Sequence, residues 1–130
     1  MNKKLKLIIL AVLFFVWLLL FIPNAKAEAP TQETVTDKVF ILDIIGYNAE
    51  KYKVSKTVME KVIACESSFN PNIIGDGGKS YGLVQIHMGY WGDKVTIEQA
   101  KDPFFAIDFL AEKLSKGKGH LWTCYRNLVK

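Results

Sequence analysis

The stretch that decides the fold is Glu66-Ser67-Ser68-Phe69-Asn70-Pro71, followed after a glycine-rich segment by Tyr81-Gly82-Leu83-Val84-Gln85-Ile86. The first segment is predicted to end a helix, because a residue before proline avoids the helical region. Residues 72–92 then contain six glycines and no helical period, which predicts turns and a short irregular hairpin. The chain therefore passes from a helix into an irregular region soon after Glu66.

The helix that ends there is predicted to begin after Ser55, whose side chain suits an N-cap, and to run to about Ser68. Its apolar residues recur at spacings of three and four, which assigns them to one buried side: Val58, Met59, Val62, Ile63 and Cys65. Glu66 follows Ile63 by three positions, so we expect it at the end of this buried stripe and not on the solvent face.

A carboxyl group at the position of Glu66 should have a raised pKa. Partial burial disfavours the charged form, and the carbonyl ends of the last helical turn disfavour negative charge as well. A raised pKa is what a general acid needs near neutral pH. On its own, however, a glutamate in a last helical turn is ordinarily a solvated residue, so the surrounding sequence has to decide.

The two quoted segments resemble the soluble lytic transglycosylase family of the lysozyme-like superfamily, over roughly Ser55 to Leu114. The resemblance implies a mainly α fold (α+β lysozyme-like), a single small helical domain in which an irregular hairpin and loop region lines a glycan cleft. It implies that Glu66 is the sole catalytic carboxylate. It further implies that Gln85 and the backbone up to Ile86 position the sugar.

The mechanism implied by the resemblance uses Glu66 twice. It protonates the oxygen of the β-1,4 bond between N-acetylmuramic acid and N-acetylglucosamine, and then takes a proton from the muramyl C6 hydroxyl, which attacks C1 and gives a 1,6-anhydro product. A hydrolytic muramidase needs a second carboxylate, for which Asp76 is the candidate; the favoured alternative is a turn aspartate that makes local hydrogen bonds. Two other functions stay open, a lysozyme-type hydrolase and a non-catalytic wall-binding domain.

The sequence departs from the family near its end, where the usual A-Y-N-A-G segment is missing. Tyr125 would replace the family tyrosine that contacts the catalytic glutamate, if a bridge from Cys65 to Cys124 held its segment beside Glu66. The alternative is that Tyr125 and Trp122 cover the disulfide.

Several other residues are candidates for contact with the substrate. Ser80 corresponds to a serine that the family often has near the catalytic carboxylate. Tyr81, Tyr90 and Trp91 offer aromatic faces to sugar rings, although Trp91 equally suits the core. His87 and His120 have no acid or cysteine partner at a useful spacing and are expected to face solvent.

Further helices are predicted on both sides of the deciding stretch. Residues 35–52 are rich in apolar residues and indicate a packed helix. Thr96 with Gln99 forms a capping box for a short helix. Asp102-Pro103 is a strong start for another, which Gly117 ends. Residues 120–130 are predicted to form a last short helix.

The chain has two cysteines, Cys65 and Cys124. If the chain is exported to an oxidising compartment, as its first residues predict, a disulfide between them is the first expectation. Closing a loop of this length would stabilise the domain by roughly 4 kcal/mol. The alternative is two free buried thiols. No histidine or further cysteine lies at a metal-binding spacing from either thiol, so we expect neither a metal site nor a cofactor.

The first residues predict a secretory signal peptide. Lys3, Lys4 and Lys6 precede an uncharged apolar run up to Ile22, and the triplet Ala25–Ala27 suits cleavage after Ala27. The run is shorter than the roughly 20 residues that span a bilayer, and an uncleaved membrane anchor is the alternative. Residues 1–27 are thus assigned to the signal peptide, 28–34 to a flexible tether and 35–130 to the lysozyme-like transglycosylase domain. We expect export to the periplasm, the cell wall or the medium.

The excess of positive charge lies in the predicted signal peptide, residues 1–27. The chain carries 17 Lys and Arg against 13 Asp and Glu, and four of these lysines precede Glu28, so the remaining domain is formally neutral. A nucleic-acid partner is therefore not expected, because it requires a basic patch on the folded domain. The expected partners are peptidoglycan glycan strands, with a secretion or conjugation machine as a further candidate and a membrane only if the leader is uncleaved. We expect a monomer.

Overall fold

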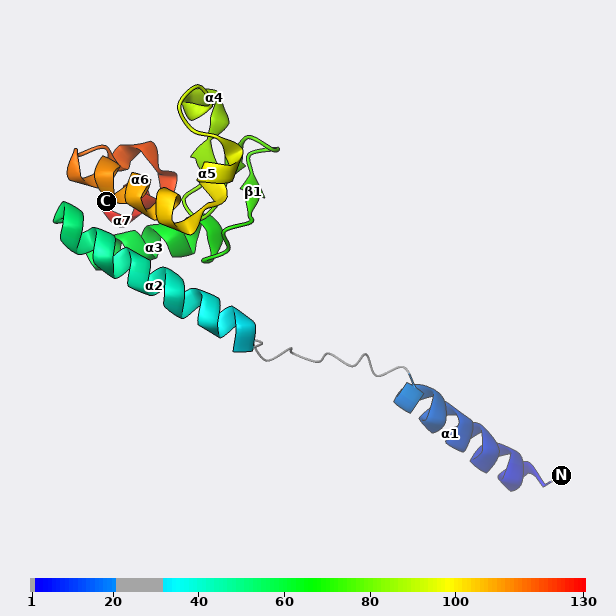
Figure 1. Ribbon diagram of the computed structural model, residues 1–130. Helices are drawn as coiled ribbons and strands as arrows, with labels where there is room; N and C mark the ends of the chain where they lie inside the picture. Colours follow the sequence, from blue (N-terminus) through cyan, green and yellow to red (C-terminus); the bar gives the residue numbers. More distant parts are fainter. Residues whose placement is uncertain (1, 21–31) are drawn as a thin grey trace. The chain divides into compact units, whose positions relative to one another are not determined.

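The computed structural model describes residues 2–20 and 32–130. They belong to two units, Met1–Thr31 and Gln32–Lys130. The first unit contains helix α1 (Lys3–Leu20), drawn in blue in Figure 1. The apolar side chains of this helix are exposed up to Trp17. Among the residues that the structure describes, no helix has the length and hydropathy that a membrane crossing requires. The predicted cleavage site after Ala27 and residues 28–31 of the predicted tether lie outside the described residues.

Helix α2 (Gln32–Tyr52) begins where the sequence predicted the end of a tether, so the expectation of a helix only from Val35 was too short. Gln and Glu are good helix formers, and adding a residue to an existing helix costs much less than starting one. The helix buries Ile41, Ile45 and Ala49, which are spaced four residues apart. It packs against α3 and α6.

Helix α3 (Lys56–Ser67) is confirmed, with its N-cap: the backbone N–H of Val58 donates to the Ser55 side chain at 3.3 Å. The helix buries Met59, Val62 and Ile63 completely. Cys65, predicted on this buried side, is exposed. Two positions after Ile63 correspond to roughly 200° around the helix axis, which turns Cys65 away from the core.

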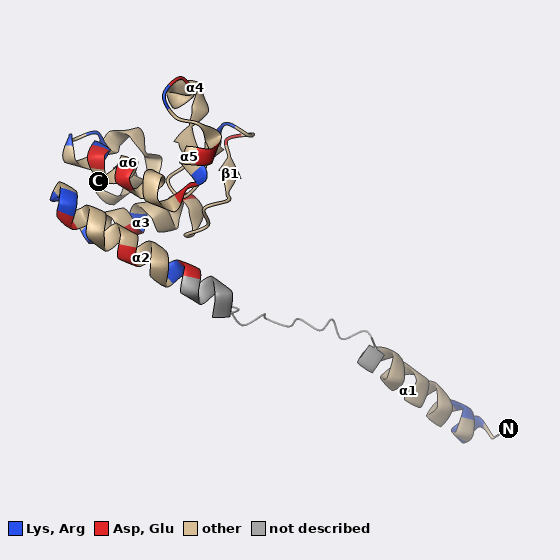
Figure 2. Ribbon diagram, viewed as in Figure 1, with Lys and Arg blue, Asp and Glu red and all other residues tan. Residues whose placement is uncertain are grey.

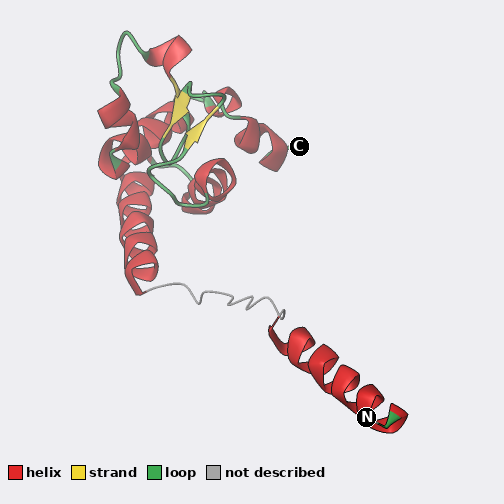
Figure 3. Ribbon diagram, turned by 90° about the vertical axis from the view of Figure 1, so that its right-hand side faces the viewer, coloured by secondary structure: helices red, strands yellow, loops and turns green. Residues whose placement is uncertain are grey.

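The predicted hairpin is present and has one strand more. Strands β1 (Ile74–Gly75), β2 (Ser80–Tyr81) and β3 (Ile86–His87) form an antiparallel sheet in the order β1-β2-β3, drawn in yellow in Figure 3. The turn after β2 requires Gly82, because its φ is +78° and an added Cβ would overlap the carbonyl oxygen of Ala100. The irregular region is thereby fixed against the helical part of the domain.

Helix α4 (Met88–Trp91) was not predicted, because four residues are too few to show a helical period. It is capped by His87, whose Nδ1 accepts a hydrogen bond from the backbone N–H of Gly89 at 3.1 Å. Helix α5 (Ile97–Lys101) has the predicted capping box of Thr96 and Gln99.

Helix α6 (Pro103–Ser115) begins as predicted, with the Asp102 side chain accepting from the N–H of Phe105 at 2.8 Å, and Gly117 follows its end with φ +69°. The last segment consists of a 3-10 turn, η1 (Gly119–Leu121), and helix α7 (Thr123–Leu128).

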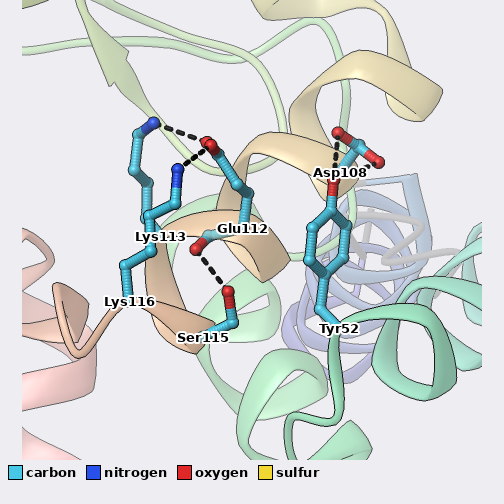
Figure 4. A network of polar contacts seen from close by, with 6 residues as sticks. All are labelled: Tyr52, Asp108, Glu112, Lys113, Ser115 and Lys116. Carbon is cyan, nitrogen blue, oxygen red and sulfur yellow. Dashed lines mark hydrogen bonds and ion pairs between the residues drawn. The ribbon is translucent and has the colours of Figure 1, made fainter.

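Polar contacts on α6 are shown in Figure 4. The Tyr52 hydroxyl lies 3.0 Å from both carboxylate oxygens of Asp108, and this contact ties the end of α2 to α6. On the next turn, Lys113 and Lys116 contact Glu112 and lower its pKa to about 2. The core between α2, α3, the sheet and α6 lies within residues 41–122. The unit Gln32–Lys130 is therefore the predicted mainly α-helical domain with a small irregular sheet.

Candidate active site

A cavity of about 720 Å³ lies where the end of α3, the small sheet, α4 and the C-terminal segment meet. We name it the Glu66 cavity. Its lining residues come from four separate parts of the chain: Glu66, Asp76, Ser80, Gln85, Ile86, His87, Tyr90, Trp91, Phe109, His120, Leu121, Trp122, Thr123 and Arg126. The cavity thus brings Glu66 together with Gln85 and Ile86, which belong to the two segments that resemble the transglycosylase family.

Glu66 is half-buried in the last turn of α3, as predicted. Burial is the main cause that raises the pKa of its carboxyl group, and the negative charge of Asp76 adds to it. The backbone N–H of Cys124 opposes this by donating to Oε1 at 3.3 Å, and the positive charge of Arg126 opposes it more weakly. The carboxyl group therefore holds its proton at a higher pH than a solvated glutamate does. The backbone N–H of Cys124 is placed to donate a hydrogen bond to its charged form.

The disulfide brings the Cys124 donor to Glu66. Cys65 and Cys124 are bonded, with their Cα atoms 6.0 Å apart, which confirms the first expectation for the two cysteines and excludes free thiols. Because Cys65 directly precedes Glu66, the bond holds the start of α7 against the end of α3.

Asp76 lies in the turn between β1 and β2 and lines the same cavity as Glu66. Its backbone is in the left-handed region, with φ +52°. The Ser80 hydroxyl, whose residue is only 1 % exposed, donates a hydrogen bond to Asp76 Oδ2. Both predicted roles of Asp76 therefore have a structural basis: it accepts a local hydrogen bond, and its carboxylate faces the cavity that contains Glu66.

Gln85 and Ile86 both line the cavity, as predicted. The Gln85 amide donates to the carbonyl oxygen of Gly82 at 2.9 Å and to that of Ile73 at 3.4 Å. The left-handed backbone of Gln85, with φ +50°, is held by these bonds. Gln85 thus fixes the shape of the cavity wall through the backbone of its own loop.

A family model described as the transglycosylase SLT domain matches residues 43–125. The chain belongs to this family. No curated protein and no solved structure gives a significant match. The match extends beyond the resemblance noted in the sequence and includes Cys124. Membership of the SLT family indicates lytic transglycosylase activity on peptidoglycan.

Two tyrosines predicted to bind substrate do not line the Glu66 cavity of the SLT domain. The Tyr81 hydroxyl donates to the Gly78 carbonyl at 2.8 Å, and the Lys101 ammonium lies 5.9 Å from its ring centroid. The Tyr125 ring packs on Gly119, where an added Cβ would lie 2.5 Å from it. The segment of Tyr125 does reach Glu66, but it does so through the backbone N–H of Cys124.

An aromatic wall of the cavity was only partly predicted. Trp91 and Trp122 both lie edge-on to Phe109, at ring-centroid distances of 5.1 and 6.3 Å. The Trp122 indole N–H donates to the Val84 carbonyl at 2.7 Å, so the C-terminal segment is also tied to the loop between β2 and β3. One of the two alternatives left open by the sequence was that Trp122 covers the disulfide. Its place in the cavity wall had no signal besides its nearness to Cys124 in sequence.

The two histidines line the cavity of the SLT domain. His120 is exposed, as predicted, whereas His87 of β3 is half-buried. Arg126 donates to the His120 carbonyl and to the Thr123 hydroxyl, each at 2.7 Å. In the described part of the chain, no three His, Cys, Asp or Glu side chains are grouped so that they could hold a metal ion.

Proposed function

We propose that this protein cleaves the β-1,4 bond between N-acetylmuramic acid and N-acetylglucosamine with Glu66 and leaves 1,6-anhydromuramyl ends. One observation carries the proposal: a half-buried glutamate with a raised pKa lies in a cavity large enough for sugar rings. The SLT family match supports the proposal, because lytic cleavage of a glycan requires an acid, and we assign that role to Glu66.

In the first step, protonated Glu66 gives its proton to the glycosidic oxygen. The bond from this oxygen to C1 of the muramyl sugar breaks, its electron pair goes to the leaving oxygen, and C1 gains oxocarbenium character. Glu66 is then a carboxylate, whose charge the Cys124 N–H stabilises at Oε1. The negative carboxylate also stabilises the positive charge at C1.

In the second step, the Glu66 carboxylate takes the proton of the muramyl C6 hydroxyl. The oxygen of that hydroxyl forms a bond to C1, which closes the anhydro ring. Glu66 is protonated again at the end, so the cycle needs neither water nor a second carboxylate. The half-buried Trp91 in the aromatic wall supports the proposal, because aromatic faces pack on sugar rings.

A muramidase that hydrolyses the same bond is the second candidate, and Asp76 is the observation that favours it. Its carboxylate lines the Glu66 cavity, and its charge is felt at Glu66. A second carboxylate beside the acid is what hydrolases use to stabilise the oxocarbenium ion or to orient a water. The Ser80 hydroxyl bond would hold Asp76 in place for that role.

The test is mass spectrometry of the soluble products from peptidoglycan treated with oxidised residues 28–130. Anhydromuramyl ends that disappear in Glu66→Gln support the transglycosylase. Reducing muramyl ends that disappear in both Glu66→Gln and Asp76→Asn assign a hydrolase. If a folded, disulfide-bonded protein gives no products, the catalytic proposal is wrong and a wall-binding function replaces it.

We further propose that the chain is exported, with cleavage after Ala27. The Cys65–Cys124 disulfide supports this, because such bonds persist in oxidising compartments. N-terminal sequencing of the protein recovered from the producing cells is the test: a start at Glu28 supports cleavage, whereas a retained Met1 in the membrane fraction supports the anchored form.

A further inference from the structure

A second groove, of about 850 Å³, lies between α2 and the first half of α6. It shares no lining residue with the Glu66 cavity. Its floor includes Ile44 and Phe105, and its rim carries three aromatic residues that are largely exposed: Phe40 at 48 %, Tyr47 at 69 % and Phe104 at 57 %. We name this feature the α2–α6 groove.

The exposed aromatic residues form one connected surface across the two helices. The rings of Phe40 on α2 and Phe104 on α6 meet edge to face, with centroids 5.5 Å apart. Exposed apolar patches of this kind on a small domain indicate contact with another molecule, and aromatic residues are enriched in the centres of protein interfaces. The groove therefore has the composition of a protein-binding surface.

The charges that line the groove are all negative. They are Asp43, Asp102 and Asp108, and the lining contains neither Lys nor Arg. Asp108 is contacted by Lys51 and Tyr52, and Asp102 caps α6. Asp43 forms no ion pair with any described residue. Figure 2 shows acidic residues in red on both α2 and α6. An occupant with positive charge is therefore favoured.

Asn48 gives an independent indication that the groove lacks a partner. Its side chain is 4 % exposed and lines the groove. Its Nδ2 donates to the Ile44 carbonyl at 3.0 Å, whereas its Oδ1 is buried with no hydrogen-bond partner in the described part of the chain. Buried polar atoms are nearly always paired, and an N–H donor brought between the two helices would pair this one.

We propose that the α2–α6 groove is a docking surface for a basic amphipathic helix of a partner protein. A groove between two helices accepts a third helix whose apolar anchors recur at three- and four-residue spacings. Leucine-sized anchors would pack on the apolar floor between the aromatic residues of the rim, and flanking Lys or Arg residues would pair with Asp43 and Asp102. An anionic membrane is a poorer occupant, because the aspartates repel its headgroups. Since the Glu66 cavity stays open, such a partner would hold the enzyme in place while it acts.

The test measures binding of a fluorescein-labelled 14-residue peptide of leucine and lysine, arranged as an amphipathic helix, to residues 28–130, which contain the whole core. Fluorescence anisotropy is read for the wild type and for Tyr47→Ser, Phe104→Ser and Asp43→Asn. Ile97→Ser and Asp93→Asn are the matched controls, because both residues are exposed and lie outside the groove. A leucine–glutamate peptide of the same length and anionic phospholipid vesicles complete the set.

We expect each aromatic variant to weaken binding at least about tenfold, Asp43→Asn to weaken it more at low salt than at high salt, and both controls to bind as the wild type does. Equal binding of wild type and groove variants would overturn the proposal, as would equal binding of the leucine–glutamate peptide or a preference for vesicles. If an aromatic variant fails to fold, the exposed Asp43→Asn still decides. The readout is binding, so a failure of the catalytic proposal leaves it unaffected.

Discussion

Removing the disulfide with Cys65→Ser and Cys124→Ser should cost much of the stability of this domain. The bond joins residues that are 59 apart in sequence, for which the chain-entropy relation gives about 4 kcal/mol at 25 °C. A domain of this size is stable by roughly 5–15 kcal/mol in total. The thermal midpoint should therefore fall by roughly 15 to 30 °C, and urea unfolding followed by circular dichroism should give the loss in free energy directly.

The same double variant should lose activity beyond its loss of folded protein. Without the bond, the Cys124 N–H loses the covalent link that holds it beside Glu66, although the bond from Trp122 to Val84 remains. Leu110→Ala is the matched control, because Leu110 is fully buried, does not line the Glu66 cavity, and its truncation costs about 2–5 kcal/mol. At equal folded fractions, we expect the serine variant to release fewer soluble muropeptides than Leu110→Ala.

Two results would refute this reasoning. If the free energy of unfolding of the serine variant lies within about 1 kcal/mol of the wild-type value, the disulfide does not stabilise the domain as the entropy relation requires. If the two destabilised variants have the same activity at equal folded fractions, the bond contributes to stability alone, and the contact between Cys124 and Glu66 has no part in the reaction.

Four further predictions follow from single contacts. Asp76→Asn removes a charge that raises the pKa of Glu66 alongside the larger effect of burial, so the alkaline limb of the activity profile should move to lower pH if Glu66 acts as an acid; an unmoved limb contradicts this. Glu66→Gln should raise the thermal midpoint at pH 7. The pKa of Glu66 in the folded protein is raised above 4.5, so the charged carboxylate destabilises the folded protein as the pH rises from the unfolded-state pKa through the folded-state pKa. The gain in the thermal midpoint should vanish below about pH 4, where the carboxyl group is neutral in both states. Trp122→Phe leaves the Val84 carbonyl without its donor and should lower the free energy of unfolding by about 1–3 kcal/mol in urea. Gly82→Ala should fail to accumulate as folded protein, because φ +78° and the overlap with α5 both exclude a Cβ.

The features that the sequence predicted correctly are those with local causes. The Ser55 cap, the capping box of Thr96 and Gln99, and the start of α6 at Asp102 each depend on contacts within four residues. The placement of Glu66 at the end of a buried stripe is equally local, because helical spacing determines it. Helix α4 was missed because its four residues are too few to show a helical period.

The features that the sequence did not predict depend on contacts between distant segments. Which face of the C-terminal segment meets the cavity is decided by the disulfide and by the bond from Trp122 to Val84, and neither is encoded in the spacing within that segment. The sequence left open whether Tyr125 contacts Glu66 or covers the disulfide; its ring packs on Gly119, and the backbone N–H of Cys124 is the group that reaches Glu66. His120 is exposed, as predicted, but it also lines the cavity because its segment folds back, and its local sequence gives no sign of that position.

The proposed mechanism uses one carboxyl group as an acid and then as a base, and the position of Cys124 is compatible with both roles. Burial raises the pKa of Glu66, because it makes the charged form of the carboxyl group more costly. A hydrogen bond from a backbone N–H favours the charged form and lowers that cost. The first effect comes from α3 and the cavity walls, and the second comes from α7. Because the disulfide joins these two parts directly beside Glu66, we expect its removal to change the balance between the two protonation states of Glu66 as well as the stability of the fold.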